Sequence, residues 1–120
     1  MTIEDYRDYC LSKKMVTEHF PFDQDTLVFK VCGKMFALTS LKNWEAGEQF
    51  LNLKCDPDYA QELRDEYESI KPGYHMNKRH WNSVYSCHND IPEKLLYELI
   101  DLSYSLVVKS LTKKQRELLL

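Results

Sequence analysis

The stretch from residue 26 to residue 39 decides the fold, because it encodes two strands joined by a tight turn: Thr26-Leu-Val-Phe-Lys-Val31, Cys32-Gly33 and Lys34-Met-Phe-Ala-Leu-Thr39. Both runs are rich in β-branched and aromatic residues, and a two-residue connection between such runs predicts an antiparallel hairpin. The glycine of the turn supplies the positive φ that the turn requires. Alternation along the first run places Leu27, Phe29 and Val31 on the core face and leaves Val28 and Lys30 on the other face.

Two more strands are expected on either side of a helix, at residues 49–54 and 81–85. Leu51 and Leu53 face the predicted core in the first of them. The side chains that the pleat turns the other way are Phe50, Asn52 and Lys54 in one strand and Trp81, Ser83 and Tyr85 in the other.

Helices are expected at about residues 3–13, 56–68 and 92–110, with a short last helix after Thr112. Asp56-Pro57 is a typical helix start, with Asp as the N-cap and Pro at the first helical position. Asp90 is expected to cap the long third helix, which carries a broad leucine-rich stripe. Residues 43–47 are interpreted as a polar turn, and Pro72-Gly73 as the break that ends the second helix.

This order predicts an α+β fold: a two-layer α/β sandwich with a largely antiparallel sheet and helices on one face. The chain of 120 residues is expected to form one domain, residues 1–120. The second face of the sheet is expected to remain partly open.

Composition excludes several classes of protein. Sixteen Lys and Arg against nineteen Asp and Glu give a net charge of −3, which excludes a globally basic nucleic-acid binder. The start of the chain lacks a basic and apolar leader, and no apolar run approaches a membrane span, so we expect a cytoplasmic protein without a membrane partner. The four cysteines form no Cys-x-x-Cys pair and no phosphate-binding glycine loop is present, so we expect no metal, no cofactor and no enzyme.

The charge is nevertheless uneven along the chain. Residues 70–88 contain no Asp or Glu, but they contain Lys71, Lys78 and Arg79 together with three histidines and the rings of Tyr74, Trp81 and Tyr85. Cations interleaved with aromatic rings suit a polyanion with stackable bases, because the charges release counterions and the rings stack. The alternative is a solvated basic loop beside an ordinary core tryptophan.

Several blocks of the chain closely resemble the MmcQ/YjbR-like family, namely His19-Phe-Pro-Phe-Asp23, Gly33-Lys-Met-Phe-Ala-Leu38, Pro72-Gly-Tyr-His-Met-Asn-Lys-Arg-His-Trp81 and Val84-Tyr85. The run Asn77-Lys-x-His-Trp81 is the most specific of them. The resemblance implies a CyaY-like (frataxin-like) sandwich and a DNA-binding role with a "double-wing" arrangement. It implies no metal ligands. The turn from Ser86 to Asp90 departs from the family's usual pattern.

Two hypotheses of function follow. In the first, the protein is a non-enzymatic DNA-binding module whose interface consists of Lys54, Lys71, His75, Asn77, Lys78, Arg79, His80, Trp81 and Tyr85. In the second, it is an adaptor that binds a protein partner, or a domain that binds a small anion, with the run from Asn77 to His80 holding a carboxylate or phosphate. A third interpretation of the same run is purely structural: Asn77 closes a turn and Trp81 packs in the fold.

Overall fold

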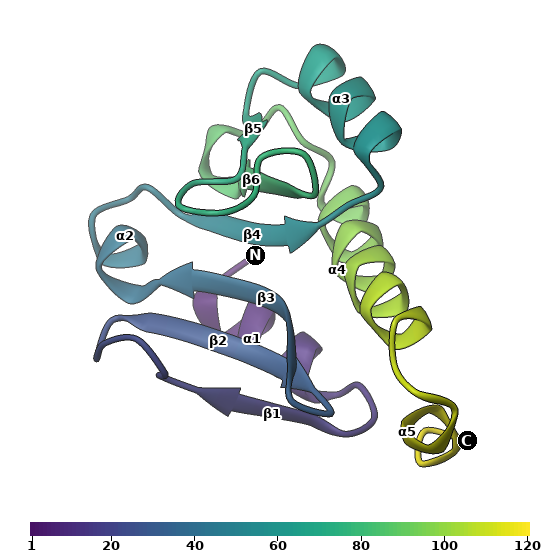
Figure 1. Ribbon diagram of the computed structural model, residues 1–120. Helices are drawn as coiled ribbons and strands as arrows, with labels where there is room; N and C mark the ends of the chain where they lie inside the picture. Colours follow the sequence, from purple (N-terminus) through teal and green to yellow (C-terminus); the bar gives the residue numbers. More distant parts are fainter.

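The centre of the molecule is a six-stranded antiparallel sheet with the strand order β1-β2-β3-β4-β6-β5 (Figure 1). The computed structural model describes residues 1–120. The strands are β1 (Val16–His19), β2 (Thr26–Val31), β3 (Lys34–Ser40), β4 (Phe50–Lys54), β5 (Ile70–Pro72) and β6 (Trp81–Tyr85). The predicted hairpin is confirmed as β2 and β3, and both turn residues take positive φ, +48° at Cys32 and +79° at Gly33.

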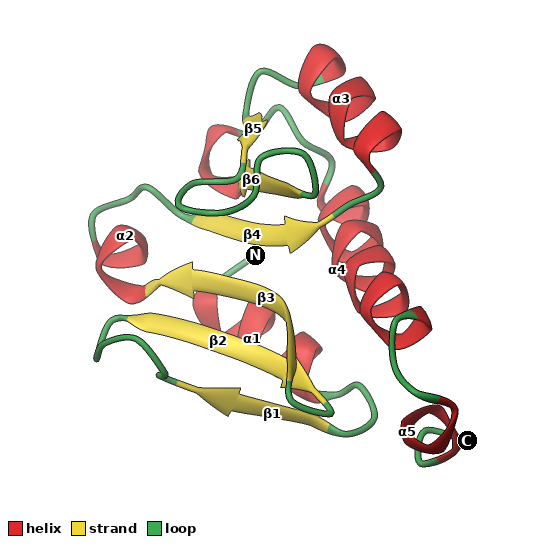
Figure 2. Cartoon of the chain, viewed as in Figure 1, coloured by secondary structure: helices red, strands yellow, loops and turns green.

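The helices are α1 (Ile3–Leu11), α2 (Leu41–Glu45), α3 (Pro57–Glu66), α4 (Glu93–Lys109) and α5 (Lys113–Glu117), with a 3-10 turn, η1 (Ser86–His88) (Figure 2). Asp56 caps α3 and Thr112 caps α5, as the sequence predicts. No helix has both the length and the apolarity to cross a membrane. The predicted α+β class is therefore confirmed.

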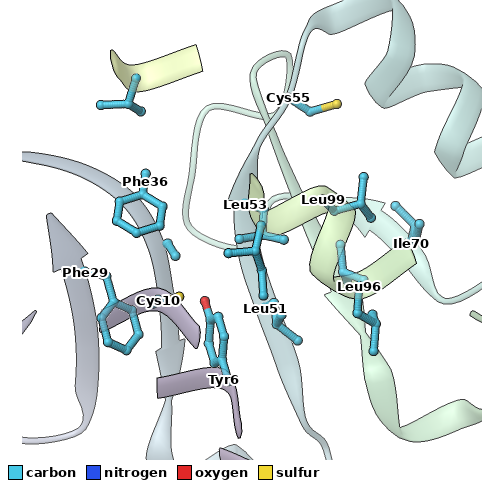
Figure 3. Packing of buried hydrophobic residues seen from close by; sticks show 14 of the residues in the cluster. Tyr6, Cys10, Phe29, Phe36, Leu51, Leu53, Cys55, Ile70, Leu96 and Leu99 are labelled. Atoms are coloured by element: carbon cyan, nitrogen blue, oxygen red, sulfur yellow. The ribbon is translucent and has the colours of Figure 1, made fainter. Parts of the chain in front are cut away.

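The main core lies between the sheet and the helices α1, α3 and α4. Figure 3 shows Leu51 and Leu53 of β4 between the aromatic rings of Tyr6 and Phe36 and the leucines of α4. The buried Ser103 of α4 fastens this helix to the sheet: its hydroxyl donates to the Phe36 carbonyl at 2.5 Å and accepts from the Lys54 main-chain N–H at 2.8 Å.

The second face of the sheet carries a smaller cluster of Val28, Leu38 and Trp81, with Met35 and Met76 packed against it. The predicted division of side chains between the two faces is therefore confirmed for β2, β4 and β6. The expected openness of this face is wrong over β6, because the loop between β5 and β6 folds back onto it and leaves Trp81 only 8% exposed.

Two local predictions are wrong, and two strands are additional to those predicted. The expected polar turn at residues 43–47 lies mostly in α2, whose N-cap hydroxyl is that of Ser40. Strands β1 and β5 were not expected; both are short edge strands that exist through pairing with a neighbour. Asp90 does not cap α4, because its carboxylate accepts instead from the Ser69 main-chain N–H at 3.2 Å.

Candidate functional site

The loop from Gly73 to His80, which joins β5 to β6, is held in a closed conformation by its own main chain. Gly73 donates to the Trp81 carbonyl at 2.8 Å, and Trp81 donates to the Asn77 carbonyl at 3.0 Å. The Asn77 side chain accepts from the Arg79 N–H at 3.0 Å, and the Lys78 Nζ donates to the Gly73 carbonyl at 3.0 Å. Much of the run from Asn77 to Trp81 therefore closes a turn, as the structural interpretation expects.

A buried polar network fastens this loop to the second face of the sheet. The Ser83 hydroxyl accepts from the Tyr74 N–H at 2.9 Å and donates to the Asn52 side-chain carbonyl. The Asn52 amide then donates to the Tyr74 carbonyl at 3.2 Å. Asn52 and Ser83 are paired across β4 and β6, so the sheet presents both groups to the same point of the loop. Because all these groups are satisfied, the network specifies where the loop lies.

Beside the fastened loop, a pocket of about 770 Å³ opens on the second face. This volume lies within the range of small-molecule sites. Three separate segments line it: the end of the β1–β2 connection and the start of β2, the β3–β4 region, and the β5–β6 loop. Its floor and walls include Met35, Leu38, Phe50, Asn52, Asn77 and Met76.

Two aromatic side chains stand at the rim of this pocket. Phe22 is 65% exposed and Tyr74 is 57% exposed, and they come from the β1–β2 connection and the β5–β6 loop. The His75 ring lies 4.0 Å from the Tyr74 ring, centroid to centroid. His75 adopts a left-handed conformation with φ of +58°, which costs a non-glycine residue free energy and is often found at functional sites.

Two carboxylates shape one wall of the pocket. Asp23 accepts from the main-chain N–H groups of Thr26 (2.6 Å) and Asp25 (2.9 Å), and these bonds hold its pKa below the usual value. Asp25 accepts from the Ser40 hydroxyl at 2.6 Å and from the Lys42 N–H at 2.7 Å. The wall is therefore rigid, and its two carboxylates outnumber the one lysine that lines the pocket, Lys42, so the balance of charge disfavours an anion there.

The structure separates the residues that the sequence predicts as one interface. His75 and Asn77 line the pocket, whereas Lys78, Arg79 and His80 do not. The stacking role predicted for Trp81 is wrong, because its ring is buried under the loop. Tyr85 is half-buried and packs against Phe50 and His88.

The predicted cations nevertheless lie on the strands beside β6 and in the loop that precedes it. Lys54 is paired with Trp81 on one side of this strand and Lys71 with Ser83 on the other, which puts the two Cα atoms about 12 Å apart by strand geometry. Lys78 and Arg79 belong to the adjoining loop. None of these four cations forms an ion pair with a carboxylate.

A second polar cluster lies at the start of β5, where Ser69 directly precedes the strand. The Ser69 hydroxyl and the His88 Nδ1 are 2.9 Å apart, and Asp90 accepts from the Ser69 main-chain N–H. Ser69 is buried, and the Asp90 carboxylate binds the serine main chain and forms no ion pair with the His88 imidazole. This arrangement orders the turn after β6 and lacks the exposed nucleophile and oriented base of covalent catalysis. No three His, Cys, Asp or Glu side chains converge in a way that could hold a metal ion.

Sequence reasoning missed Phe22, Asp23, Asp25, Ser40 and Lys42 as parts of a site. The block His19-Phe-Pro-Phe-Asp23 could have indicated part of this site. Its two phenylalanines lie beside a proline in a polar connection, where neither a strand nor a helix requires them, so a binding role would explain them.

Comparison with known proteins agrees with this fold. The sequence model of the YjbR family matches residues 11–106. The chain is 46% identical over 98 residues to the uncharacterised protein YbdF of Escherichia coli O157:H7, covering 82% of this chain and 77% of that protein. It is 32% identical over 120 residues to the uncharacterised protein YjbR of Escherichia coli K12, covering 99% and 98% of the two chains.

Two solved structures are also similar. The crystal structure of Deinococcus radiodurans DR2400, a DUF419 domain protein, superposes with a TM-score of 0.85 at 42% identity, covering 98% of this chain and 87% of that one. A Pseudomonas syringae protein superposes with a TM-score of 0.72 at 27% identity, covering 88% and 98%. The match across most of the chain and the identity to full-length relatives show that the protein belongs to the YjbR family.

Proposed function

We propose that the protein is a non-enzymatic binding domain that takes a small molecule in the pocket on the second face of its sheet. The observation that carries this proposal is the rigid construction of the pocket. One wall is fixed by Asp23 and Asp25, and the other is fixed by the network of Asn52 and Ser83. A preformed site of this kind binds without a large ordering cost.

The lining supports a partly aromatic ligand without negative charge. Phe22 and Tyr74 offer exposed rings on two different segments, while Leu38 and Met76 offer an apolar surface beneath them. Asp23 and Asp25 disfavour an anion, so the anion-binding form of the second hypothesis is not the form that this pocket supports.

The four cysteines are free, which supports a cytoplasmic location because such thiols persist in a reducing compartment.

An NMR fragment screen tests this proposal. Uncharged and cationic aromatic fragments should shift the amide signals of Asn52 and residues 74–77, and Tyr74→Ala should abolish or weaken the shifts. Tyr59→Ala is the matched control, because Tyr59 is an exposed tyrosine on α3 that lies outside the pocket. Fragments that shift other regions, or that bind Tyr74→Ala as well as the wild type, would contradict the proposal.

DNA binding is the second candidate, and the unpaired cations around β6 favour it. Lys71 and Arg79 are exposed and form no ion pair, so they are free to contact phosphates, whereas the Nζ of the exposed Lys78 already donates to the Gly73 carbonyl and would have to share its charge with a phosphate. The "double-wing" role that the family resemblance implies would use this end of the sheet. Trp81 takes no part in it, so binding would rest on charge and would be weak and largely independent of sequence.

Fluorescence anisotropy with a labelled duplex tests this second candidate. Three phosphate contacts predict a slope of about −2.7 for log affinity against log salt, and Lys71→Gln with Arg79→Gln should reduce it to about −0.9. Lys42→Gln with Lys94→Gln is the control of equal charge change. Absence of binding at low salt, or an equal effect of both double variants, would exclude DNA binding through these residues.

A further inference from the structure

A second pocket, of about 570 Å³, lies at the corner where the end of α1, the end of α4 and α5 meet. Figure 1 shows this corner around the C-terminus, away from the β5–β6 loop. Hydrogen bonds join its parts. The Tyr104 hydroxyl donates to the Lys14 carbonyl at 2.7 Å, and the Lys14 Nζ donates to the main-chain oxygen of Leu120, the last residue of the sequence, at 2.9 Å.

The lining of this corner pocket contains only two chemical types of side chain. One type is apolar or aromatic, and the other is cationic; the residues are Tyr104, Val108, Leu119, Leu120, Lys13, Lys14 and Arg116. No carboxylate side chain lines it. This composition is opposite in charge to the sheet-face pocket with its two aspartates, so the two pockets select different ligands.

The cations of the corner differ in how they are used. The Lys13 Nζ is paired with the Asp101 carboxylate at 2.5 Å and lies over the rings of Tyr9 and Tyr104, at 4.9 and 5.2 Å from their centroids. The Arg116 guanidinium forms no ion pair, whereas the Lys14 ammonium holds the main-chain oxygen of Leu120, so an anionic head group would share this ammonium with that oxygen.

The surrounding sequence strengthens the positive field. Residues 101–117 contain four cations, Lys109, Lys113, Lys114 and Arg116, against two carboxylates, Asp101 and Glu117. In a protein with a net charge of −3, this excess makes the corner a local attractor for anions.

We propose that the corner pocket binds a single-chain amphipathic anion, such as a long-chain carboxylate. Its charged head would bind Lys14 and Arg116 through charge-assisted hydrogen bonds, and its alkyl chain would cover Val108 and Leu119. The apolar wall is mostly aliphatic, and Lys13 already covers the one ring that lines it. Nucleic acid is therefore a poorer fit than an alkyl chain, because bases need free aromatic faces for stacking.

Isothermal titration calorimetry with acetate, octanoate, decanoate and laurate, each below its micelle concentration, tests this proposal. Laurate should bind with one molecule per protein, affinity should rise about fourfold per added methylene, and acetate should not bind measurably. Lys14→Gln with Arg116→Gln should weaken laurate at least about tenfold. Lys71→Gln with Arg79→Gln, which removes the same charge elsewhere, should leave it unchanged.

Other outcomes would overturn the assignment. Absence of laurate binding, or equal losses in the two double variants, would exclude a specific head-group site at the corner. Loss of laurate binding in Tyr74→Ala would place the ligand in the sheet-face pocket. Duplex DNA binding that is lost in Lys14→Gln with Arg116→Gln, without laurate binding in the wild type, would identify the corner as a nucleic-acid interface.

Discussion

Ser83 is the side chain that fastens the β5–β6 loop to the sheet, and Ser83→Ala tests whether this fastening forms the sheet-face pocket. The variant removes one hydrogen bond that the hydroxyl accepts from Tyr74 and one that it donates to Asn52. At about 1 kcal/mol for each bond, the free energy of unfolding should fall by about 2 kcal/mol. For a chain of 120 residues, this corresponds to a Tm lower by about 8 °C.

Ser103→Ala is a closely matched control. Ser103 is 0% exposed and Ser83 is 1% exposed, and each hydroxyl accepts one main-chain N–H and donates one hydrogen bond. Ser103, however, joins α4 to the opposite face of the sheet. Both variants should therefore lose similar stability, while only Ser83→Ala should release the loop.

Hydrogen exchange measured by NMR separates the two effects. In Ser83→Ala, the amide of Tyr74 should exchange at least about tenfold faster than expected from the change in global stability, because its acceptor is gone. In Ser103→Ala, the exchange rate of the Tyr74 amide should change only as much as the change in global stability predicts. Equal acceleration of this amide in both variants, or fragment binding retained in Ser83→Ala, would refute the claim that this network forms the pocket wall.

Three further predictions concern other parts of the fold. Gly73→Ala should lower the free energy of unfolding by about 1–3 kcal/mol in urea titrations, because the added Cβ would lie 2.7 Å from the Cβ of Trp81; an unchanged midpoint would contradict the close approach. Thiol labelling at pH 8 should modify the half-buried Cys32 and Cys87 first. Burial raises the pKa of the Cys10 thiol, and it raises the pKa of Cys55 to about 11, so these two cysteines should react only when the fold opens. Equal labelling rates for all four cysteines would contradict this order. Hydrogen bonding to Ser69, through its side chain and its main-chain N–H, holds the pKa of Asp90 below the usual value of 3.8. Stability from this group is therefore present above about pH 4 and is lost as the pH falls through the lowered pKa. Asp90→Asn should flatten the acid limb of a plot of stability against pH, and an unchanged limb would argue against the contribution.

The elements that the sequence predicts correctly are those whose formation is determined by residues close together in the sequence. The hairpin of β2 and β3 follows from alternation and a glycine turn, and α3 follows from the Asp56-Pro57 start. The long stripe of leucines similarly predicts α4. In contrast, β1 and β5 have four and three residues, and each is defined by its pairing with the next strand along the chain, so their own residues carry no clear strand pattern.

The site was harder to predict because it depends on long-range contacts. Alternation correctly placed Asn52 and Ser83 on the second face, but their partner, the Tyr74 main chain, is defined only when the loop folds back. That same folding buries Trp81, which the basic and aromatic composition of residues 70–88 had indicated as a stacking platform. The sheet-face pocket combines three segments, so it has no signature in any one of them.

The most direct test of the sheet-face pocket is a crystal structure with the fragment that gives the largest NMR shifts. The fragment should lie over Leu38, with its ring against Phe22 or Tyr74 and a polar group near Asp25. A fragment bound elsewhere on the surface, with the sheet-face pocket filled by solvent alone, would contradict this prediction.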